Sequence, residues 1–257
     1  MSTLALAARD SSTMVRRQLK RLLRYPSMTV QLVATPVVIL FLFVYVLGGT
    51  LGDGLGGGRD AYVNYVVPGI LLMAAAMAAT GTAVMVATDM TEGVIARFRT
   101  MRISRASVLT GHVVGSVIQQ LLGMVVLVGV ALAIGFRPDA TAVEWLAATG
   151  LLTLFAVTVT WLSVALGLRS PTPEAASNAP MPLVLLPFLG SGFVPTDSMP
   201  TALRWFAEYQ PFTPIMETVR GLLLGTPIGG SAAIAIAWCA GIAVVSYLWA
   251  KKTFDRA

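Results

Sequence analysis

Charged residues are scarce in this chain. Only 12% of its 257 residues are Asp, Glu, Lys or Arg, against about 25% in a typical soluble domain. Hydrophobic residues make up 56%, and the mean hydropathy is +0.78. Because Asp, Lys or Arg at the centre of a membrane-spanning helix costs about 2.5–3.5 kcal/mol on insertion scales, a chain built from such helices is depleted in charge. The deficit predicts an all-α integral membrane protein and excludes a set of soluble domains.

Residues that form disulfides or bind metals are almost absent. Cys239 is the only cysteine and His112 the only histidine, which excludes an internal disulfide framework and a four-cysteine zinc site. We interpret Cys239 as a small apolar packing residue. His112 stands near the start of a predicted span, where we expect a helix-end hydrogen-bonding group.

Acidic residues are missing from the middle of every predicted span. Those near spans lie at the expected membrane edges, at Asp89, Glu92, Glu144 and Glu174. Proton-coupled pumps carry their protons on intramembrane acids or histidines, so this distribution argues against an ion-coupled transporter.

Nucleotide-binding motifs are also missing. No Gly-x-x-x-x-Gly-Lys-Ser/Thr segment occurs, and no Gly-Lys dipeptide, so the chain does not bind nucleotide through a P-loop. We expect it to be no enzyme itself and to bind no cofactor. If the protein moves a molecule across the membrane, another chain must supply the energy.

Apolar runs of about 20 residues predict six membrane-spanning helices, because lipid-exposed backbone must satisfy its own hydrogen bonds. The predicted spans cover residues 28–48, 62–88, 106–135, 144–168, 177–193 and 231–250. The fifth is short and holds Pro180, Pro182 and Pro187. Since each proline removes a backbone donor and kinks a helix, we expect this span to be bent or broken. Residues 1–257 are expected to form a single transmembrane domain.

Basic residues predict the orientation, because short cytoplasmic segments are enriched in Lys and Arg. Of the 18 basic residues, 14 lie before the first span, between the second and third, between the fourth and fifth, or after the sixth. They are Arg9, Arg16, Arg17, Lys20, Arg21, Arg24, Arg97, Arg99, Arg102, Arg105, Arg169, Lys251, Lys252 and Arg256. The other connections hold 4, Arg59, Arg137, Arg204 and Arg220. Both termini are therefore predicted in the cytoplasm. The net charge of +6 follows membrane edges, so no nucleic-acid partner is expected.

The N-terminal residues 1–27 are predicted to hold an interfacial amphipathic helix. Leucines recur at helical spacing between 19 and 23, and basic residues occupy the rest of the turn. Such a helix lies with its apolar face in lipid and its cations toward anionic headgroups. An ordinary basic flank of the first span would have the same composition. The basic positions are Arg16, Arg17, Lys20, Arg21 and Arg24.

The loop over residues 89–105 is too polar to be embedded and too rich in apolar residues for a solvated tether. A short helix here would present Val94, Phe98 and Met101 on one side, flanked by arginines. That pattern is typical of a small docking element for another protein. From the residues alone, a solvated charged loop is an equal alternative.

A second unusual region, residues 194–228, follows the fifth span. It is rich in proline and aromatic residues and carries two charge pairs at helical spacing, Arg204 with Glu208 and Glu217 with Arg220. Two short amphipathic helices at the outer interface fit this pattern, because Trp and Tyr favour headgroup depth. We expect these helices to be re-entrant or interfacial.

Three segments spread over nearly the whole chain carry a family resemblance. The first holds Arg24-Tyr25-Pro26, Leu42 to Gly49 and Val66-Val67-Pro68-Gly69-Ile70. The second runs from Gly93 to Met101 and on through Ser104-Arg105 to Gly111. The third holds Phe193-Val194-Pro195, Met199-Pro200, Pro211 to Pro214 and Arg220 to Leu223. In this order they resemble the membrane subunits of type-2 ATP-binding-cassette (ABC) exporters, especially the daunorubicin-resistance-like permeases of drug and lipid efflux. The chain departs from the family pattern at Ala96, Arg102 and Gln210.

The resemblance implies partners for this chain. Two copies of a separate ABC ATPase subunit would bind ATP and Mg²⁺, and two permease copies would pair, with a homodimer expected and a heterodimer left open. The loop would be a cytoplasmic coupling helix that sits in a groove of the ATPase. The ATPase-coupling residues would be Glu92, Gly93, Val94, Arg97, Phe98, Arg99 and Arg102. Membrane lipid would contact the spans.

The resemblance also implies a pathway that alternates between inward-facing and outward-facing states. Large polarizable side chains on the first two spans are candidates to line it, because Met and aromatic residues repack around varied apolar ligands. These candidates are Phe41, Tyr45, Met73, Met77 and Met85. Facing lipid, or packing between helices, is the alternative for each. The outer helices would gate the exit through Trp205, Glu208, Tyr209, Glu217 and Arg220.

The leading hypothesis is therefore efflux of an amphipathic or hydrophobic substrate, such as a drug, lipid or glycolipid. Richness in Ala, Val, Gly and Arg is typical of a GC-rich bacterial genome, so the bacterial inner membrane is the expected location. The alternatives are a membrane anchor or assembly factor that transports nothing, and an ion-coupled secondary transporter.

Overall fold

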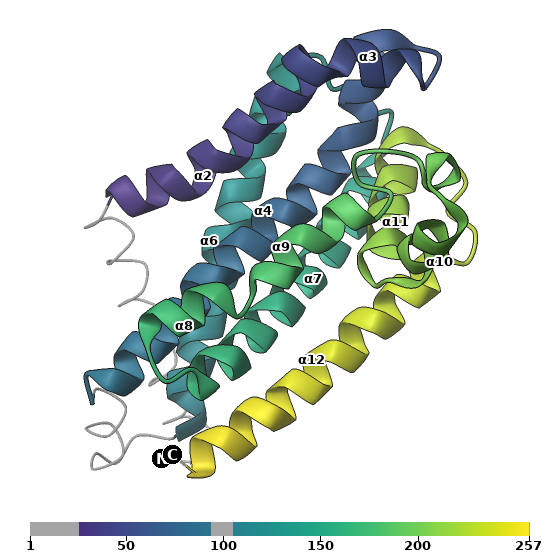
Figure 1. The fold of residues 1–257 in the computed structure, drawn as a ribbon. Coiled ribbons are helices and arrows are strands. Elements are labelled where there is room, and N and C mark those ends of the chain that lie inside the picture. Colours follow the sequence, from purple (N-terminus) through teal and green to yellow (C-terminus); the bar gives the residue numbers. More distant parts are fainter. Residues whose placement is uncertain (1–25, 94–104, 257) are drawn as a thin grey trace.

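The computed structural model describes residues 26–93 and 105–256, and within these ranges every regular element is a helix (Figure 1). The long elements are α2 (Pro26–Phe41), α4 (Gly58–Thr91), α6 (Arg105–Ala133), α7 (Ala142–Arg169) and α12 (Ser231–Arg256). The short ones are the π-helix η1 (Leu42–Leu47), α3 (Gly48–Asp53), α8 (Pro173–Asn178), α9 (Met181–Leu185), the 3₁₀ turns η2 (Leu186–Leu189) and η3 (Thr196–Ser198), α10 (Thr201–Tyr209) and α11 (Phe212–Leu224).

Five helical stretches among the described residues are long and apolar enough to cross a membrane. They are Val33–Asp53, Gly58–Thr91, Leu109–Ala133, Ala142–Arg169 and Ser231–Phe254. Gly58–Thr91, Ala142–Arg169 and Ser231–Phe254 extend the predicted second, fourth and sixth spans by at most about four residues. Leu109–Ala133 lies within the predicted third span. The fifth, Val33–Asp53, joins α2, η1 and α3 and continues beyond residue 48, where the prediction ended the first span. The described part of the chain is thus all-helical and has the helices of a multi-pass membrane protein.

The predicted fifth span, residues 177–193, is divided into α8, α9 and η2. Pro180 stands between α8 and α9, Pro182 lies in the first turn of α9, and Pro187 lies in η2. Because proline cannot donate a backbone hydrogen bond, no continuous helix forms here, and the expected break is confirmed. All three pieces lie along α4 (Figure 1).

The centre of the fold is α4, which packs against α2, α3, α6, α7, α8 and α11. Its 34 residues span about 50 Å at 1.5 Å per residue, which exceeds a hydrocarbon core of about 30 Å. Glycines allow other backbones to approach it closely. A Cβ at Gly167 of α7 would lie 2.5 Å from the backbone O of Ala83, and one at Gly69 would lie 2.5 Å from the backbone O of Gly192. Substituting either glycine would force the packed segments apart.

A capping box starts α7. The backbone N–H of Thr141 donates to Oε2 of Glu144 at 2.7 Å, and the backbone N–H of Glu144 donates to the Thr141 hydroxyl at 3.4 Å. Two of the N–H groups that every helix start leaves without partners are satisfied in this way. The cap places the start of α7 two residues before the predicted position, 144.

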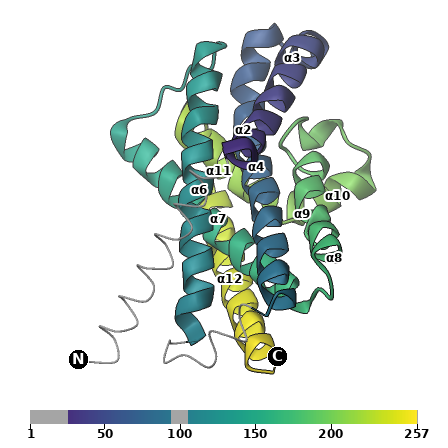
Figure 2. The ribbon, with the colours of Figure 1, turned by 90° about the vertical axis from the view of Figure 1, so that its left-hand side faces the viewer.

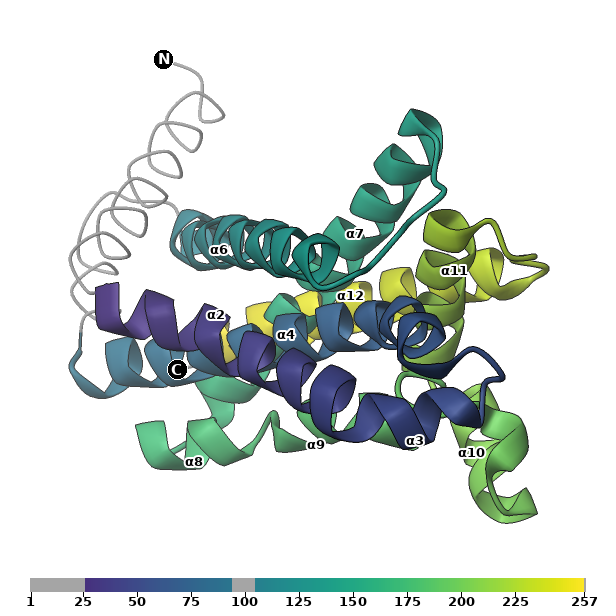
Figure 3. The same cartoon turned by 90° about the horizontal axis from the view of Figure 1, so that it is seen from above.

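The two ends of the bundle differ in construction (Figures 1 and 2). The C-terminal end of α4, the N-terminal end of α6 and the C-terminal end of α12 lie together at what we name the loop end. The opposite end, named the cap end, carries α3, α10 and α11. Viewed from above, α12 and α7 lie on one side of α4 and α2 on the other, with α8 and α9 following its length (Figure 3).

Candidate functional site

The predicted coupling loop, residues 89–105, begins later than its sequence suggested. Helix α4 continues through Thr91, so residues 89–91 are helical, and Glu92 is the exposed residue that ends the helix. Gly93 follows with a φ of 68°, a left-handed conformation that glycine adopts without steric cost. Val94, Arg97, Phe98, Arg99 and Arg102 lie outside the described residues, as do all the basic positions of the predicted N-terminal helix, Arg16, Arg17, Lys20, Arg21 and Arg24.

Asp89 is buried at the loop end, although the sequence placed it at a membrane edge, in a segment too polar to be embedded. It is 5% exposed and His112 of α6 is 7% exposed. Oδ2 of Asp89 lies 3.1 Å from Nε2 of His112, within hydrogen-bonding distance. A carboxylate is tolerated there because its partner is buried with it. His112 is thus a hydrogen-bonding group near a helix end, as predicted.

The Asp89–His112 contact belongs to a row of polar contacts that α6 makes inside the bundle. His112, Ser116 and Gln120 recur every four residues, and all three are buried. The Thr82 hydroxyl of α4 donates to Oγ of Ser116 at 2.9 Å. Nε2 of Gln120 donates to Oγ1 of Thr160 in α7 at 2.8 Å. Hydrogen bonds between membrane helices average about 0.6 kcal/mol, so this polar stripe fixes the rotation of α6 more than it stabilises the bundle.

Arg220 organises the cap end. Its Nη2 donates to the backbone O of Ser191 at 2.6 Å and to that of Tyr65 at 3.2 Å, and its Nε donates to the same Tyr65 oxygen at 3.3 Å. The guanidinium also lies over the Tyr65 ring, 3.9 Å from its centroid. One side chain therefore joins α11 to α4 and to the turn after η2. Glu217, its expected partner, instead accepts a hydrogen bond from the Ser231 hydroxyl at the start of α12, at 3.2 Å.

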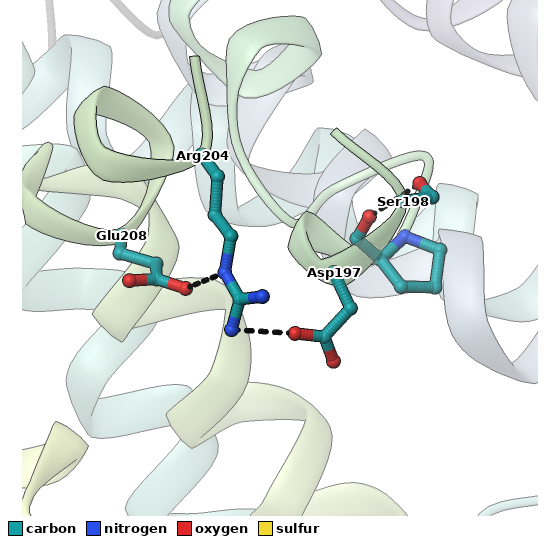
Figure 4. A network of polar contacts seen from close by, with 5 residues as sticks. Asp197, Ser198, Arg204 and Glu208 are labelled. Carbon is teal, nitrogen blue, oxygen red and sulfur yellow. Dashed lines mark hydrogen bonds and ion pairs between the residues drawn. The ribbon is translucent and has the colours of Figure 1, made fainter. Parts of the chain in front are cut away.

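An exposed ion-pair cluster lies on α10 (Figure 4). Nε of Arg204 is 2.7 Å from Oε1 of Glu208, as the i, i+4 spacing predicted, and Nη2 is 2.6 Å from Oδ1 of Asp197. Glu208 first, and then the Asp197 charge, raise the pKa of Arg204 above its ordinary value. The Ser198 hydroxyl donates to the backbone O of Pro195 at 2.7 Å in the same turn. Exposed ion pairs of this kind add little stability.

The aromatic residues predicted for the outer gate lie on the surface of α10. Trp205 is 66% exposed and Tyr209 65% exposed, with their ring centroids 5.2 Å apart. With Glu208 they form an exposed group at the cap end. Glu217 and Arg220 belong to the interior contacts of α11, so the five residues divide into two groups.

The predicted pathway residues also lie in different environments. Phe41 and Tyr45 stack on the exposed side of α2 and η1, with ring centroids 5.8 Å apart. Met73 is 1% exposed and belongs to the core. Met77 and Met85 of α4 are partly buried. None of these five side chains lines either of the two cavities identified within the described part of the chain.

Several buried polar residues, Ser116, Gln120 and Ser191 among them, were not among the sequence candidates. The stripe of His112, Ser116 and Gln120 has a sequence signal, because polar residues four apart in an apolar run mark one helix face. Gln210 and Ser191 have none, since their partners lie about 20 residues away, at Leu186 and Thr213. The contact of Arg220 with Tyr65 joins residues 155 positions apart, which local spacing cannot reveal.

Comparison with known proteins decides the family. The family model described as ABC-2 type transporter matches residues 10–224, which run from the N-terminal segment to the end of α11. The chain belongs to the ABC-2 type transporter family. The matched range includes the predicted coupling loop, α4 and the cap-end helices.

Curated relatives of this ABC-2 chain are permeases. It is 27% identical over 243 residues to a daunorubicin resistance ABC transporter permease protein of Streptomyces coeruleorubidus, covering 94% of this chain and 84% of the relative. It is 25% identical over 210 residues to a probable doxorubicin resistance ABC transporter permease protein of Mycobacterium tuberculosis, covering 81% of this chain and 76% of the relative. The ABC-2 family supplies the membrane permease component of ABC transporters, and its permeases work with an ATP-binding subunit.

Proposed function

We propose that this chain is the membrane-spanning permease subunit of an ATP-driven exporter, which forms the pathway for an amphipathic or hydrophobic substrate such as a drug, lipid or glycolipid. The ABC-2 family match over residues 10–224 carries the proposal. The helical bundle supports it, because five apolar helices provide a membrane-embedded body. The names of the relatives, which concern daunorubicin and doxorubicin resistance, favour a drug as the cargo.

The bundle crosses the membrane six times in this proposal, with the loop end in the cytoplasm of a bacterial inner membrane. The broken segment α8–α9–η2, the predicted fifth span in chain order, adds one crossing to the five long apolar helices. It runs beside α4 from the loop end toward the cap end (Figure 1). The excess of Lys and Arg in the connections at the loop end favours this orientation. Both termini then lie in the cytoplasm, and α10 and α11 lie at the outer surface.

A separate ATPase supplies the energy for transport. Two copies of it bind ATP and Mg²⁺ and dock on two copies of the permease. The docking residues are those of the predicted coupling loop, where Val94 and Phe98 insert into the ATPase and the surrounding charged residues contact its rim. Helix α4 leads directly from Glu92 at the loop end to the cap end. A displacement of the loop would therefore be transmitted along one continuous helix as the pathway alternates between inward-facing and outward-facing states.

Transport into inside-out vesicles tests the proposal. Vesicles that contain this chain with its ATPase should accumulate daunorubicin when ATP is supplied, and should not do so with a non-hydrolysable ATP analogue. Fluorescence quenching of the drug inside the vesicles reports accumulation. ATP hydrolysis without accumulation of daunorubicin or of any lipid or glycolipid tested would contradict an export function and favour a non-transporting anchor.

One observation favours a second candidate, an ion-coupled secondary transporter. Asp89 and His112 are both buried and lie 3.1 Å apart, and ionisable groups within membrane spans mark proton pathways in pumps and transporters. The same vesicles separate the two candidates. A protonophore should leave ATP-driven accumulation intact if the ATPase supplies the energy, and should abolish accumulation if a proton gradient does.

A further inference from the structure

The last turn of α12 is built differently from the rest of that helix. Among the five apolar helical stretches, the one in α12 has the smallest buried share, and Val244, Val245 and Leu248 are each more than half exposed. The segment Lys251–Arg256 that follows contains one apolar residue, Phe254, and its side chain is only 4% exposed. A phenyl ring buried within a charged segment shows that this turn is docked on the bundle.

Phe254 belongs to a buried apolar cluster, which we name the loop-end cluster, to which four helices contribute. Its members include Val86 of α4, Leu109 and Val113 of α6, and Leu168 of α7, all at most 7% exposed. Phe254 is the largest of the buried members. An aromatic side chain buries about 150–250 Å² and dominates the energetics of a core. Removal of this ring would therefore loosen the loop-end cluster more than removal of any other member.

Both ends of the predicted coupling loop are anchored in the loop-end cluster. On the α4 side, Met90 packs against the cluster just before the helix ends at Glu92. On the α6 side, the helix begins at Arg105 and reaches the cluster at Leu109, about one turn later. The buried carboxylate–histidine contact joins the same two helices at this end. The cluster therefore fixes the spacing between the point where the loop leaves α4 and the point where it enters α6.

We propose that Phe254 is a positioning residue for ATP-driven export. Its ring holds the two ends of the coupling loop at the spacing at which the loop docks on the ATPase. The other end of α12 begins at Ser231, whose hydroxyl donates to Glu217 of α11 at 3.2 Å. With α4, α12 is thus a second continuous helix that joins the loop end to the cap end. The docking of the loop rests on the proposed function, whereas the packing of its ends by Phe254 does not.

Hydrogen exchange of the full chain in lipid nanodiscs, measured by mass spectrometry, tests the packing without ATP or an ATPase. In Phe254→Ala, which leaves a cavity in the cluster, the amides of residues 86–93 and 105–113 should exchange about tenfold faster, because exchange follows local opening. A residue that only stabilised the bundle would speed exchange at the cap end to the same degree. Phe254→Leu restores most of the lost volume and should return exchange at both loop ends close to that of the wild type.

Phe136→Ala is the matched control. Phe136 is 0% exposed and lies in the connection between α6 and α7, away from the loop end, so the same ring is removed from an equally buried place. This variant should lose stability but leave exchange of residues 105–113 unchanged. Phe254→Val, which leaves a smaller cavity, serves in place of Phe254→Ala if the latter does not fold. Unchanged exchange at the loop ends on loss of the Phe254 ring, or equally fast exchange there in Phe136→Ala, would overturn the proposal.

The vesicle assay then tests the consequence for transport, as the amount of daunorubicin accumulated per ATP hydrolysed. This ratio should fall about two- to thirtyfold in Phe254→Ala, the range that mutations within coupling networks produce. It should keep the wild-type value in Phe136→Ala, because loss of folded protein lowers accumulation and hydrolysis together.

The two assays separate the positioning role from the proposed function. A wild-type ratio in Phe254→Ala, despite faster exchange at the loop ends, would overturn the positioning role. If wild-type vesicles hydrolyse ATP but accumulate none of the cargoes tested, the proposed function fails, and the exchange result alone decides whether Phe254 positions the loop.

Discussion

Replacing Arg220 by methionine should destabilise the cap end by about 3 kcal/mol. The change removes the short hydrogen bond to the Ser191 carbonyl and the bonds to Tyr65, and a hydrogen bond from a charged group contributes about 1.5–3 kcal/mol. It also removes the cation–π contact with the Tyr65 ring, which contributes about 1 kcal/mol. Methionine fills most of the volume, so no large cavity term is added. For a chain of this size the loss corresponds to a fall in Tm of roughly 6–12 °C.

The chain carries its own reporter for this measurement. Cys239 is the only cysteine and is 1% exposed, so a fluorogenic thiol reagent reacts as α12 separates from the bundle on heating. Arg204→Met is the matched control, because Arg204 is an exposed arginine of the neighbouring helix α10 and its ion pairs add little stability. The reasoning is refuted if Arg220→Met melts with the wild type, or if Arg204→Met loses as much stability.

Two further predictions concern packing around α4. Gly167→Ala should lower the free energy of unfolding by about 1–3 kcal/mol, because its Cβ would meet the Ala83 backbone. Gly150→Ala, in open space on the same helix, is the control and should be neutral or stabilising. Equal shifts in Tm for the two variants in the thiol assay would contradict this prediction. Tyr62→Phe should cost about 1 kcal/mol through loss of the 3.2 Å bond to the Phe193 carbonyl, seen as a small fall in Tm, and an unchanged Tm would argue against that contact.

The membrane-spanning helices could be predicted from sequence because their signal is local. An apolar run of sufficient length must be helical in lipid, and the runs behind α4, α6, α7 and α12 gave the right elements. The boundaries agree within about four residues, except that α12 continues to Arg256, beyond the predicted end at residue 250. The prolines at 180, 182 and 187 predicted the broken segment for an equally local reason. In contrast, Pro68 lies inside continuous α4, so proline alone does not decide where a membrane helix ends.

The contacts within the site could not be predicted, because they depend on partners far away in the chain. Helical spacing suggested Glu217 for Arg220, yet the guanidinium binds backbone oxygens of Tyr65 and Ser191. Charge indicated that the segment beginning at Asp89 is too polar to be embedded, yet Asp89 is buried against His112. The π-helical stretch Leu42–Leu47 contains the residues of an ordinary membrane helix and has no distinguishing pattern.

The family was recognisable from short segments, whereas the coupling assignment stays a prediction. Glu92 and Gly93 end α4 as described, and the remaining coupling residues lie outside the described part of the chain. The predicted pathway side chains lie in separate environments, from the exposed Tyr45 to the buried Met73. Composition can nominate adaptable side chains, but it cannot show which of them face a common space.

Co-purification tests most directly the central claim that a separate ATPase drives this permease. Tagged wild-type protein, gently solubilised from its native membrane, should bring down a P-loop ATPase in equal amount. Phe98→Asp in the coupling loop should lose it, whereas Phe206→Asp, the same change at an exposed position of the cap end, should retain it. Absence of any ATPase from the wild-type sample, even after mild cross-linking, would contradict the account.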